Sequence, residues 1–134
     1  VRSSAASDVY KRQEWEIKAD RLFGDELLLE MLIRNIFENA FRATDEGGKI
    51  STYVYENEKN TVFEITDTGC GMEPEELEKI KEPFYRVDKS RSRKQGGTGL
   101  GVSLCQKIVE KHDGSMEYRS KKGVGTTVTV KIPL

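Results

Sequence analysis

The chain has 134 residues, the length of one ordinary domain, and its 36% hydrophobic and 34% charged residues are typical of a folded globular protein. Its 22 basic and 23 acidic residues give a net charge of −1, which excludes the positive field of a nucleic-acid-binding domain. No apolar run reaches the roughly 20 residues of a membrane-spanning helix, and two cysteines without a CxxC pair exclude zinc and disulfide scaffolds. We therefore expect one cytoplasmic domain.

The first half of the chain predicts a tail, a helix and a hairpin. Residues 1–13 are small and polar without periodicity, so we expect a non-native or disordered tail followed by a domain of residues 14–134. Apolar residues recur at three- and four-residue steps over residues 25–44, which predicts a helix with one buried face. Residues 49–56 and 61–66 are rich in β-formers and are joined by a polar turn, so they predict an antiparallel hairpin.

The second half predicts two helices and two strands around a long loop. Residues 74–80 form a short acidic segment that begins with proline, which predicts a short helix. Residues 82–98 have no period and predict a mobile loop, and residues 99–112 predict an amphipathic helix. Strands are predicted over residues 115–120 and 126–132. Together these elements predict an α+β fold, a two-layer sandwich in which a mixed, mostly antiparallel sheet packs on about three helices.

Two glycine clusters require a functional explanation. DTGCGM at residues 67–72 follows a predicted strand, and GGTGLG at residues 96–101 leads into a helix, where exposed N–H groups and the helix dipole favour phosphate. The second cluster fits neither GxxxxGK[ST] nor the dinucleotide pattern GxGxxG. A simple tight turn explains either cluster equally well, so neither one defines a site by itself.

Four motifs in order resemble the catalytic, ATP-binding domain of sensor histidine kinases, in the gyrase-like ATPase superfamily. NIFENAFR at residues 35–42 resembles the N box, and DTGCGM at residues 67–72 resembles the first glycine box. EPFYR at residues 82–86 resembles the aromatic box, and GTGLG at residues 97–101 resembles the second glycine box. The resemblance covers about residues 25–134 and implies the fold of that superfamily, the Bergerat fold.

The resemblance implies a site for ATP and Mg²⁺ and assigns roles to single residues. Asn39 is expected to place its amide oxygen on Mg²⁺, because a neutral oxygen suits a site where triphosphate supplies negative charge. Asp67 is expected to accept the exocyclic amine of adenine, and Glu38 to act as a base toward an acceptor histidine. The implied catalytic residues are Glu38, Asn39, Arg42 and Arg86. The implied nucleotide-binding residues are Asn35, Asn39, Arg42, Asp67, Gly69, Gly71, Phe84, Arg86, Lys89, Gly97, Thr98, Gly99, Leu100 and Gly101.

The segment between the aromatic box and the second glycine box is basic. Counted from Arg86 to Lys94, it has five cations (Arg86, Lys89, Arg91, Arg93 and Lys94) against one acid, Asp88, which gives a charge of +4. We interpret it as a lid attracted to triphosphate, with Arg86 as the first contact and Phe84 as its anchor. The ordinary explanations remain open: a solvated charge run for the basic residues and for Arg42, core packing for Phe84, and a buried amide for Asn39.

Three functions from different classes remain open. The first is a histidine kinase domain that transfers the ATP γ-phosphoryl group to a histidine. The second is an ATP hydrolase or serine kinase of the same fold, but such hydrolases carry a glutamate four residues before the metal asparagine, where this chain has Asn35. The third is a non-catalytic nucleotide-binding module.

The resemblance implies partners outside this chain. Its one histidine, His112, ends the last predicted helix and does not match an acceptor site. We therefore expect a fragment that does not phosphorylate itself and that acts on a histidine-bearing dimerisation domain of the same protein. A response regulator is the expected downstream partner, with no direct contact to nucleic acid, and with membrane anchoring only through upstream segments.

Overall fold

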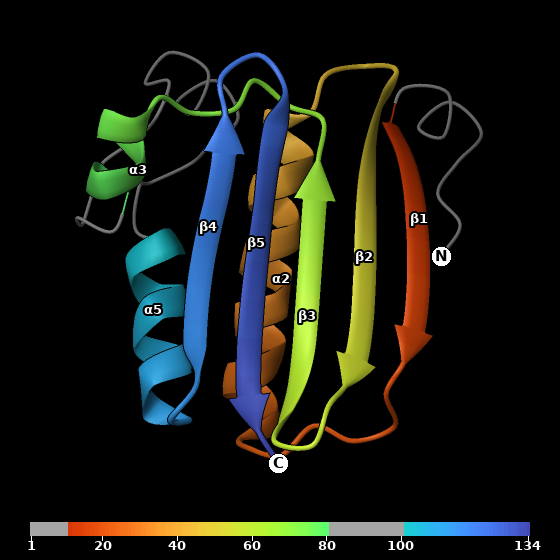
Figure 1. The fold of residues 1–134 in the computed structure, drawn as a ribbon, viewed down its shortest axis with the longest axis vertical. Coiled ribbons are helices and arrows are strands. Elements are labelled where there is room, and N and C mark those ends of the chain that lie inside the picture. The colour runs from red at the N-terminus through yellow and green to blue at the C-terminus, as the bar shows by residue number, and fades with distance from the viewer. Residues whose placement is uncertain (1–10, 81–100) are drawn as a thin grey trace.

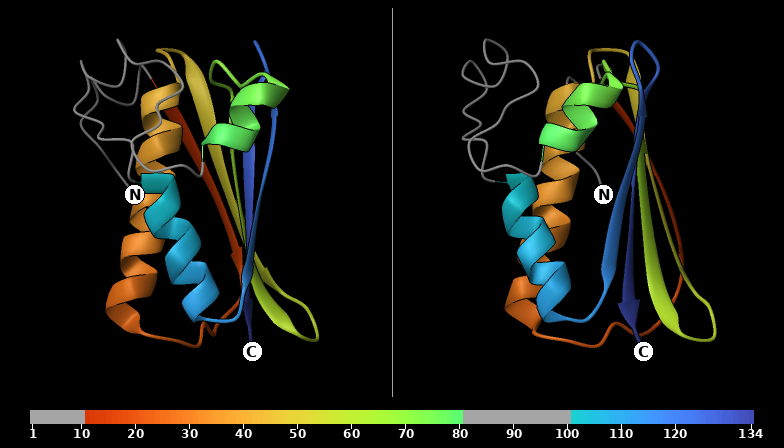
Figure 2. Two further views of the ribbon diagram at one scale, coloured as in Figure 1. Left: turned by 90° about the vertical axis from the view of Figure 1, so that its left-hand side faces the viewer. Right: turned by 60° about the vertical axis from the view of Figure 1, so that its left-hand side comes forward.

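The computed structural model describes residues 11–80 and 101–134, which form one five-stranded sheet with helices on one of its faces (Figures 1 and 2). The strand order is β1-β2-β3-β5-β4; β1 pairs with β2 in parallel, and the other neighbours are antiparallel. This arrangement confirms the predicted two-layer α+β fold. The elements are β1 (Lys11–Lys18), α2 (Glu26–Ala43), β2 (Gly48–Glu56), β3 (Asn60–Asp67), α3 (Pro74–Lys79), α5 (Gly101–Lys111), β4 (Ser115–Lys121) and β5 (Gly125–Pro133).

Strand β1 is the element that the sequence pattern does not predict. It begins at Lys11, so the first three residues of the strand lie within the segment that the sequence predicts to be a tail, residues 1–13. Six of its eight residues are exposed, because it is an edge strand, and its polar residues therefore show no apolar alternation. The rest of the predicted tail lies outside the described residues.

The core lies between the buried side of α2, the inner face of the sheet and α5. Asp25 caps the N-terminus of α2, because its side chain accepts a hydrogen bond from the backbone N–H of Leu28 at 2.9 Å. Leu32, in the middle of the helix, is fully buried. Burying one such leucine contributes about 2 kcal/mol. The core residues of α2 are Leu29, Leu32, Ile36 and Ala40; those of α5 are Cys105, Ile108 and Val109; those of the sheet include Ile50, Val54, Ile65, Val128 and Val130. In the described part of the chain, no helix has the length and apolar character needed to cross a membrane.

The loop after β3 is attached to β2 on one side and to the turn between β4 and β5 on the other. The N–H of Thr68 donates to the carbonyl of Lys49, and the hydroxyl of Thr68 accepts from the N–H of the same lysine. On the other side, the N–H of Gly123 donates to the carbonyl of Cys70 at 2.7 Å. Gly71 has a φ of +69°, and a Cβ there would clash with the carbonyl of Lys121 at the end of β4. Packing against the protein itself therefore requires glycine at this position.

Replacing Gly71 by alanine should destabilise the domain more than replacing Gly123 by alanine. Both residues have positive φ, so both variants carry backbone strain of about 1–2 kcal/mol. Only at Gly71 would the new Cβ also meet backbone, since nothing lies within 4 Å of the equivalent position at Gly123. We expect Gly71→Ala to lower the free energy of unfolding, measured by urea denaturation, by about 3 kcal/mol or more. Equal losses in the two variants would contradict this explanation.

Candidate nucleotide-binding site

The C-terminal half of α2 brings together three of the predicted motifs. A Cβ built at Gly101, the first residue of α5, would lie 3.5 Å from Asn39 Nδ2 and 3.8 Å from Asn35 Oδ1. The loop after β3 reaches the same helix, because a Cβ at Gly69 would clash with the carbonyl oxygen of Ala43. Residues far apart in the sequence therefore meet around the end of α2 that lies next to the start of α5.

Asp67 is a buried carboxylate at the end of β3. It is 6% exposed, and its Oδ1 accepts hydrogen bonds from the backbone N–H groups of Gly69 at 2.8 Å and Thr126 at 3.3 Å. Among the described residues, Oδ2 receives no hydrogen bond, so one oxygen remains to accept from a bound molecule. Burial raises the pKa of Asp67 above its ordinary value of 3.8, and the two backbone hydrogen bonds partly offset that rise.

Asn39 and Arg42 are joined in this structure. Arg42 Nη2 donates to Asn39 Oδ1 at 2.7 Å, so a guanidinium group contacts the oxygen that the sequence predicts to be a Mg²⁺ ligand. One turn earlier, Asn35 Nδ2 donates to the carbonyl of Met31 on the same helix, which leaves Asn35 Oδ1 on the side of Gly101. Two amide oxygens and one cation thus lie beside the start of α5.

A Mg²⁺ ion would find few protein ligands here. Within residues 11–80 and 101–134, no three His, Cys, Asp or Glu side chains gather in a way that could hold a metal ion. Asn39 Oδ1 has the chemistry of a Mg²⁺ ligand, since the ion prefers oxygen and completes its shell with water and phosphate. The fit requires Arg42 to move away from this oxygen, because a cation and a guanidinium group repel each other.

The remaining predicted site residues divide into two groups. Glu38 is exposed on α2. Gly69 and Gly71 are required by packing against Ala43 and Lys121, which no pattern in the sequence predicts. The other predicted residues lie outside the described part of the chain: Phe84, Arg86, Lys89, Gly97, Thr98, Gly99 and Leu100.

His112 connects the two long helices. Its Nε2 accepts from the backbone N–H of Asp25 at 3.0 Å, and its Nδ1 lies 2.8 Å from the carbonyl of Ile108, so Nδ1 carries the proton of the neutral ring. Gly24 packs against this ring so closely that a Cβ there would clash with it. Both ring nitrogens are therefore engaged: Nε2 holds the end of α5 to the start of α2, and Nδ1 bonds within the end of α5.

Comparisons of this chain with known proteins agree on one protein family. Residues 24–134 match the family model described as "Histidine kinase-, DNA gyrase B-, and HSP90-like ATPase". Sensor protein SrrB of Staphylococcus aureus strain NCTC 8325 is 37% identical over 123 residues, which are 92% of this chain and 20% of SrrB. The chain therefore spans about a fifth of the length of this curated relative.

Solved structures show the same fold. The mycobacterial sensor histidine kinase MprB has a TM-score of 0.80 and 25% identity, over 92% of this chain and 83% of that one. The nucleotide-free catalytic domain of histidine kinase ThkA has a TM-score of 0.77 and 25% identity, over 95% of this chain and 80% of that one. Full-length ShkA in complex with AMPPNP, at 22% identity and a TM-score of 0.79, matches in fold over 96% of this chain and 26% of that one.

Proposed function

This chain belongs to the histidine kinase-, DNA gyrase B- and HSP90-like ATPase family, as an ATP-binding catalytic domain of the sensor histidine kinase type, and we propose that it transfers the γ-phosphoryl group of ATP to a histidine on a separate dimerisation domain. One observation carries the proposal: Asn35, Asn39 and Gly101 meet at the end of α2 that the Asp67 loop also contacts. A response regulator is the proposed acceptor after the histidine.

Asp67 is the proposed adenine-recognition residue. Its Oδ1 is held by two backbone N–H groups, and this leaves Oδ2 to accept a hydrogen bond from the exocyclic amine. The same two bonds fix the side chain in one position before the nucleotide arrives, which lowers the entropy lost on binding.

The phosphates are proposed to bind between α2 and the start of α5. The N-terminus of a helix carries partial positive charge, so phosphate oxygens are favoured near Gly101. Arg42 is close enough to exchange its bond to Asn39 for a charge-assisted bond to phosphate. Asn39 Oδ1 is then exposed to hold Mg²⁺, which neutralises phosphate charge when bound. The predicted contacts from Phe84 to Leu100 remain part of this proposal.

The proposed reaction is a displacement at the γ-phosphorus. A neutral imidazole nitrogen of the acceptor forms the P–N bond, while the bond from phosphorus to the bridging oxygen breaks and ADP leaves. The proton on the other imidazole nitrogen passes to a base, for which we propose Glu38, because this carboxylate is exposed on α2 where a partner domain can approach it.

Replacing Asp67 by asparagine should abolish ATP binding and leave the fold intact. Asparagine keeps an oxygen for Gly69 and Thr126 but presents an amide donor to the adenine amine, so we expect the affinity measured by calorimetry to fall about 100-fold or more. Asp20→Asn, which neutralises an exposed carboxylate, is the matched control. Unchanged affinity in Asp67→Asn would contradict the assignment.

The same variant tests the pKa of Asp67 in the absence of nucleotide. Because the folded-state pKa is raised above 3.8, the folded protein binds more protons than the unfolded chain in the window just above that value. The stability of the parent should therefore fall, relative to Asp67→Asn, as the pH rises from below 3.8 toward neutrality. Chemical denaturation at several pH values measures the difference.

Replacing Asn39 by alanine should remove the effect of Mg²⁺ on ATP binding. In the parent, we expect added Mg²⁺ to increase the affinity for ATP. In Asn39→Ala, the ratio of the ATP affinities with and without Mg²⁺ should fall to about one, because the side chain that binds the ion is missing. Asn35→Ala is the comparison variant on the same helix. It should lower the affinity for ATP but keep the ratio of the affinities with and without Mg²⁺. An unchanged ratio in Asn39→Ala would exclude it as a ligand.

This chain alone should bind ATP without acquiring a phosphoryl group. Its one histidine, His112, is engaged through both ring nitrogens. Incubation with γ-labelled ATP should give no acid-labile label on the chain, and addition of the dimerisation domain of its parent protein should give label on that domain. His112→Gln should transfer label to the partner as the parent does. Label on the chain itself that disappears in His112→Gln would overturn the proposal.

A further inference from the structure

The helical layer covers only part of the sheet. In the described chain, α2 lies over the centre of the sheet and α5 lies next to β4, while no helix lies over the edge strand β1 on the same face (Figures 1 and 2). The residues of this uncovered side are not all polar. Trp15 of β1 is 41% exposed and stacks on Phe37 of α2, with ring centroids 5.6 Å apart.

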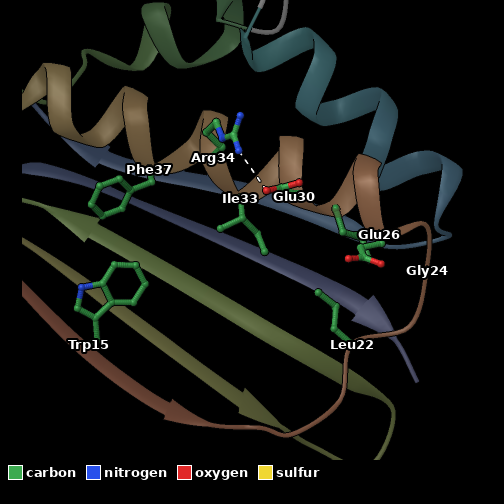
Figure 3. A pocket seen from close by; sticks show the side chains of 9 residues that line it. Trp15, Leu22, Gly24, Glu26, Glu30, Ile33, Arg34 and Phe37 are labelled. Atoms are coloured by element: carbon green, nitrogen blue, oxygen red, sulfur yellow. Dashed lines mark hydrogen bonds and ion pairs between the residues drawn. The ribbon is translucent and has the colours of Figure 1, made fainter. Parts of the chain in front are cut away.

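An apolar groove runs along this side of α2. Figure 3 shows Trp15 and Phe37 facing each other at one end, with Ile33 and Leu22 directed into the space between α2 and the sheet. The groove has a volume of about 740 Å³. The edge of the groove formed by α2 is charged, because the Glu30 carboxylate and the Arg34 guanidinium form an ion pair there at 3.1 Å. The lining residues are Trp15, Leu22, Gly24, Glu26, Leu29, Glu30, Ile33, Arg34 and Phe37.

The groove and the nucleotide site use opposite sides of α2. At about 3.6 residues per turn, positions 26, 30, 33 and 37 fall on one side of the helix, and positions 35, 39 and 42 fall roughly half a turn away. The buried residues of α2 lie between these two sides. A change at the groove can therefore be measured against an independent readout, the affinity for ATP.

We propose that this groove binds an amphipathic helix with an aliphatic face and a basic residue opposite Glu26. The groove follows about three turns of α2, or roughly 16 Å, which is the contact length of a helix packed alongside another. Such a helix would extend the layer of α2 and α5 over β1. Glu26, in the first turn of α2, forms the acidic end of the groove and has no ion pair with the described residues, so its carboxylate can pair with a lysine or arginine of the partner.

A second copy of this chain is a poorer occupant than a separate helix. The apolar sides of α2 and α5 are buried in its own core. Large apolar side chains that remain exposed near the start of α2, Phe23 at 51% and Leu27 at 66%, come from a loop and from the same helix as the groove. Two copies with parallel grooves would bring their acidic ends together, and two copies with antiparallel grooves would bring Glu26 of each against the apolar end at Trp15 and Phe37 of the other.

Trp15 provides a direct measurement, because it is the single tryptophan of the chain. The probe is a synthetic peptide of about 15 residues with leucines at helical spacing on one face and one lysine beside that face. We expect it to change the emission of Trp15 in a saturable manner. A peptide of the same composition in scrambled order should give no change, and a peptide with glutamate in place of the lysine should bind about threefold more weakly.

Two substitutions separate the groove from general surface effects. Ile33→Glu places a charge in the apolar groove and should weaken the peptide about tenfold or more. Leu27→Glu makes the same type of change at an exposed position of α2 outside the groove and should have no effect. Glu26→Lys should reverse the preference, so that the glutamate peptide binds better than the lysine peptide. It also keeps the test decisive if Ile33→Glu does not fold.

Three outcomes would overturn the proposal. The first is that the leucine peptide leaves the emission of Trp15 unchanged. The second is that Leu27→Glu and Ile33→Glu lose equal amounts of affinity for the peptide. The third is that Glu26→Lys still prefers the lysine peptide to the glutamate peptide. A Trp15 signal that changes with protein concentration alone, together with a doubled mass in sedimentation, would instead identify the groove as a self-association surface and would also contradict the proposal. The affinity for ATP should be the same in all three variants, so failure here leaves the proposed function untouched.

Discussion

The packing of α2 against the sheet and α5 is the constraint on which the rest of the structure depends. Leu29, Leu32, Ile36 and Ala40 occupy one side of this helix, and their burial fixes its rotation about its own axis. Once that rotation is set, Asn35 and Asn39 must lie on one flank and Phe37 on the other. The proposed nucleotide site and the apolar groove are therefore two consequences of the same buried surface.

The site places polar groups where hydration is reduced, and the protein compensates with backbone hydrogen bonds. Asp67 accepts two backbone N–H groups, yet burial still raises its pKa, so the ionised form is held at some cost in free energy. Arg42 and Asn39 satisfy each other in a similar way. These arrangements keep the polar groups in place without a ligand, and under the proposed function a nucleotide exchanges them for its own contacts.

The glycines near the site illustrate how a functional motif can also be a packing requirement. Gly69 approaches the end of α2 and Gly71 approaches the end of β4, each at a distance that no side chain permits. This close approach brings the loop after Asp67 against the helix that carries Asn39. The geometry of the site thus depends on glycine through contacts within the protein, whether or not the base also requires it.

Local patterns in the sequence determined much of this protein. The apolar period of residues 26–43 and the β-rich segments of the hairpin specify their elements through neighbouring residues, and the four motifs identify the family. The tertiary structure determined the features that depend on contacts between residues far apart in the sequence. The edge strand β1 pairs with β2 through backbone groups that no side-chain period reveals. The bond from His112 to Asp25, the contact of Gly69 with Ala43 and the stacking of Trp15 on Phe37 each join residues more than 20 positions apart, which a sequence pattern cannot bring together.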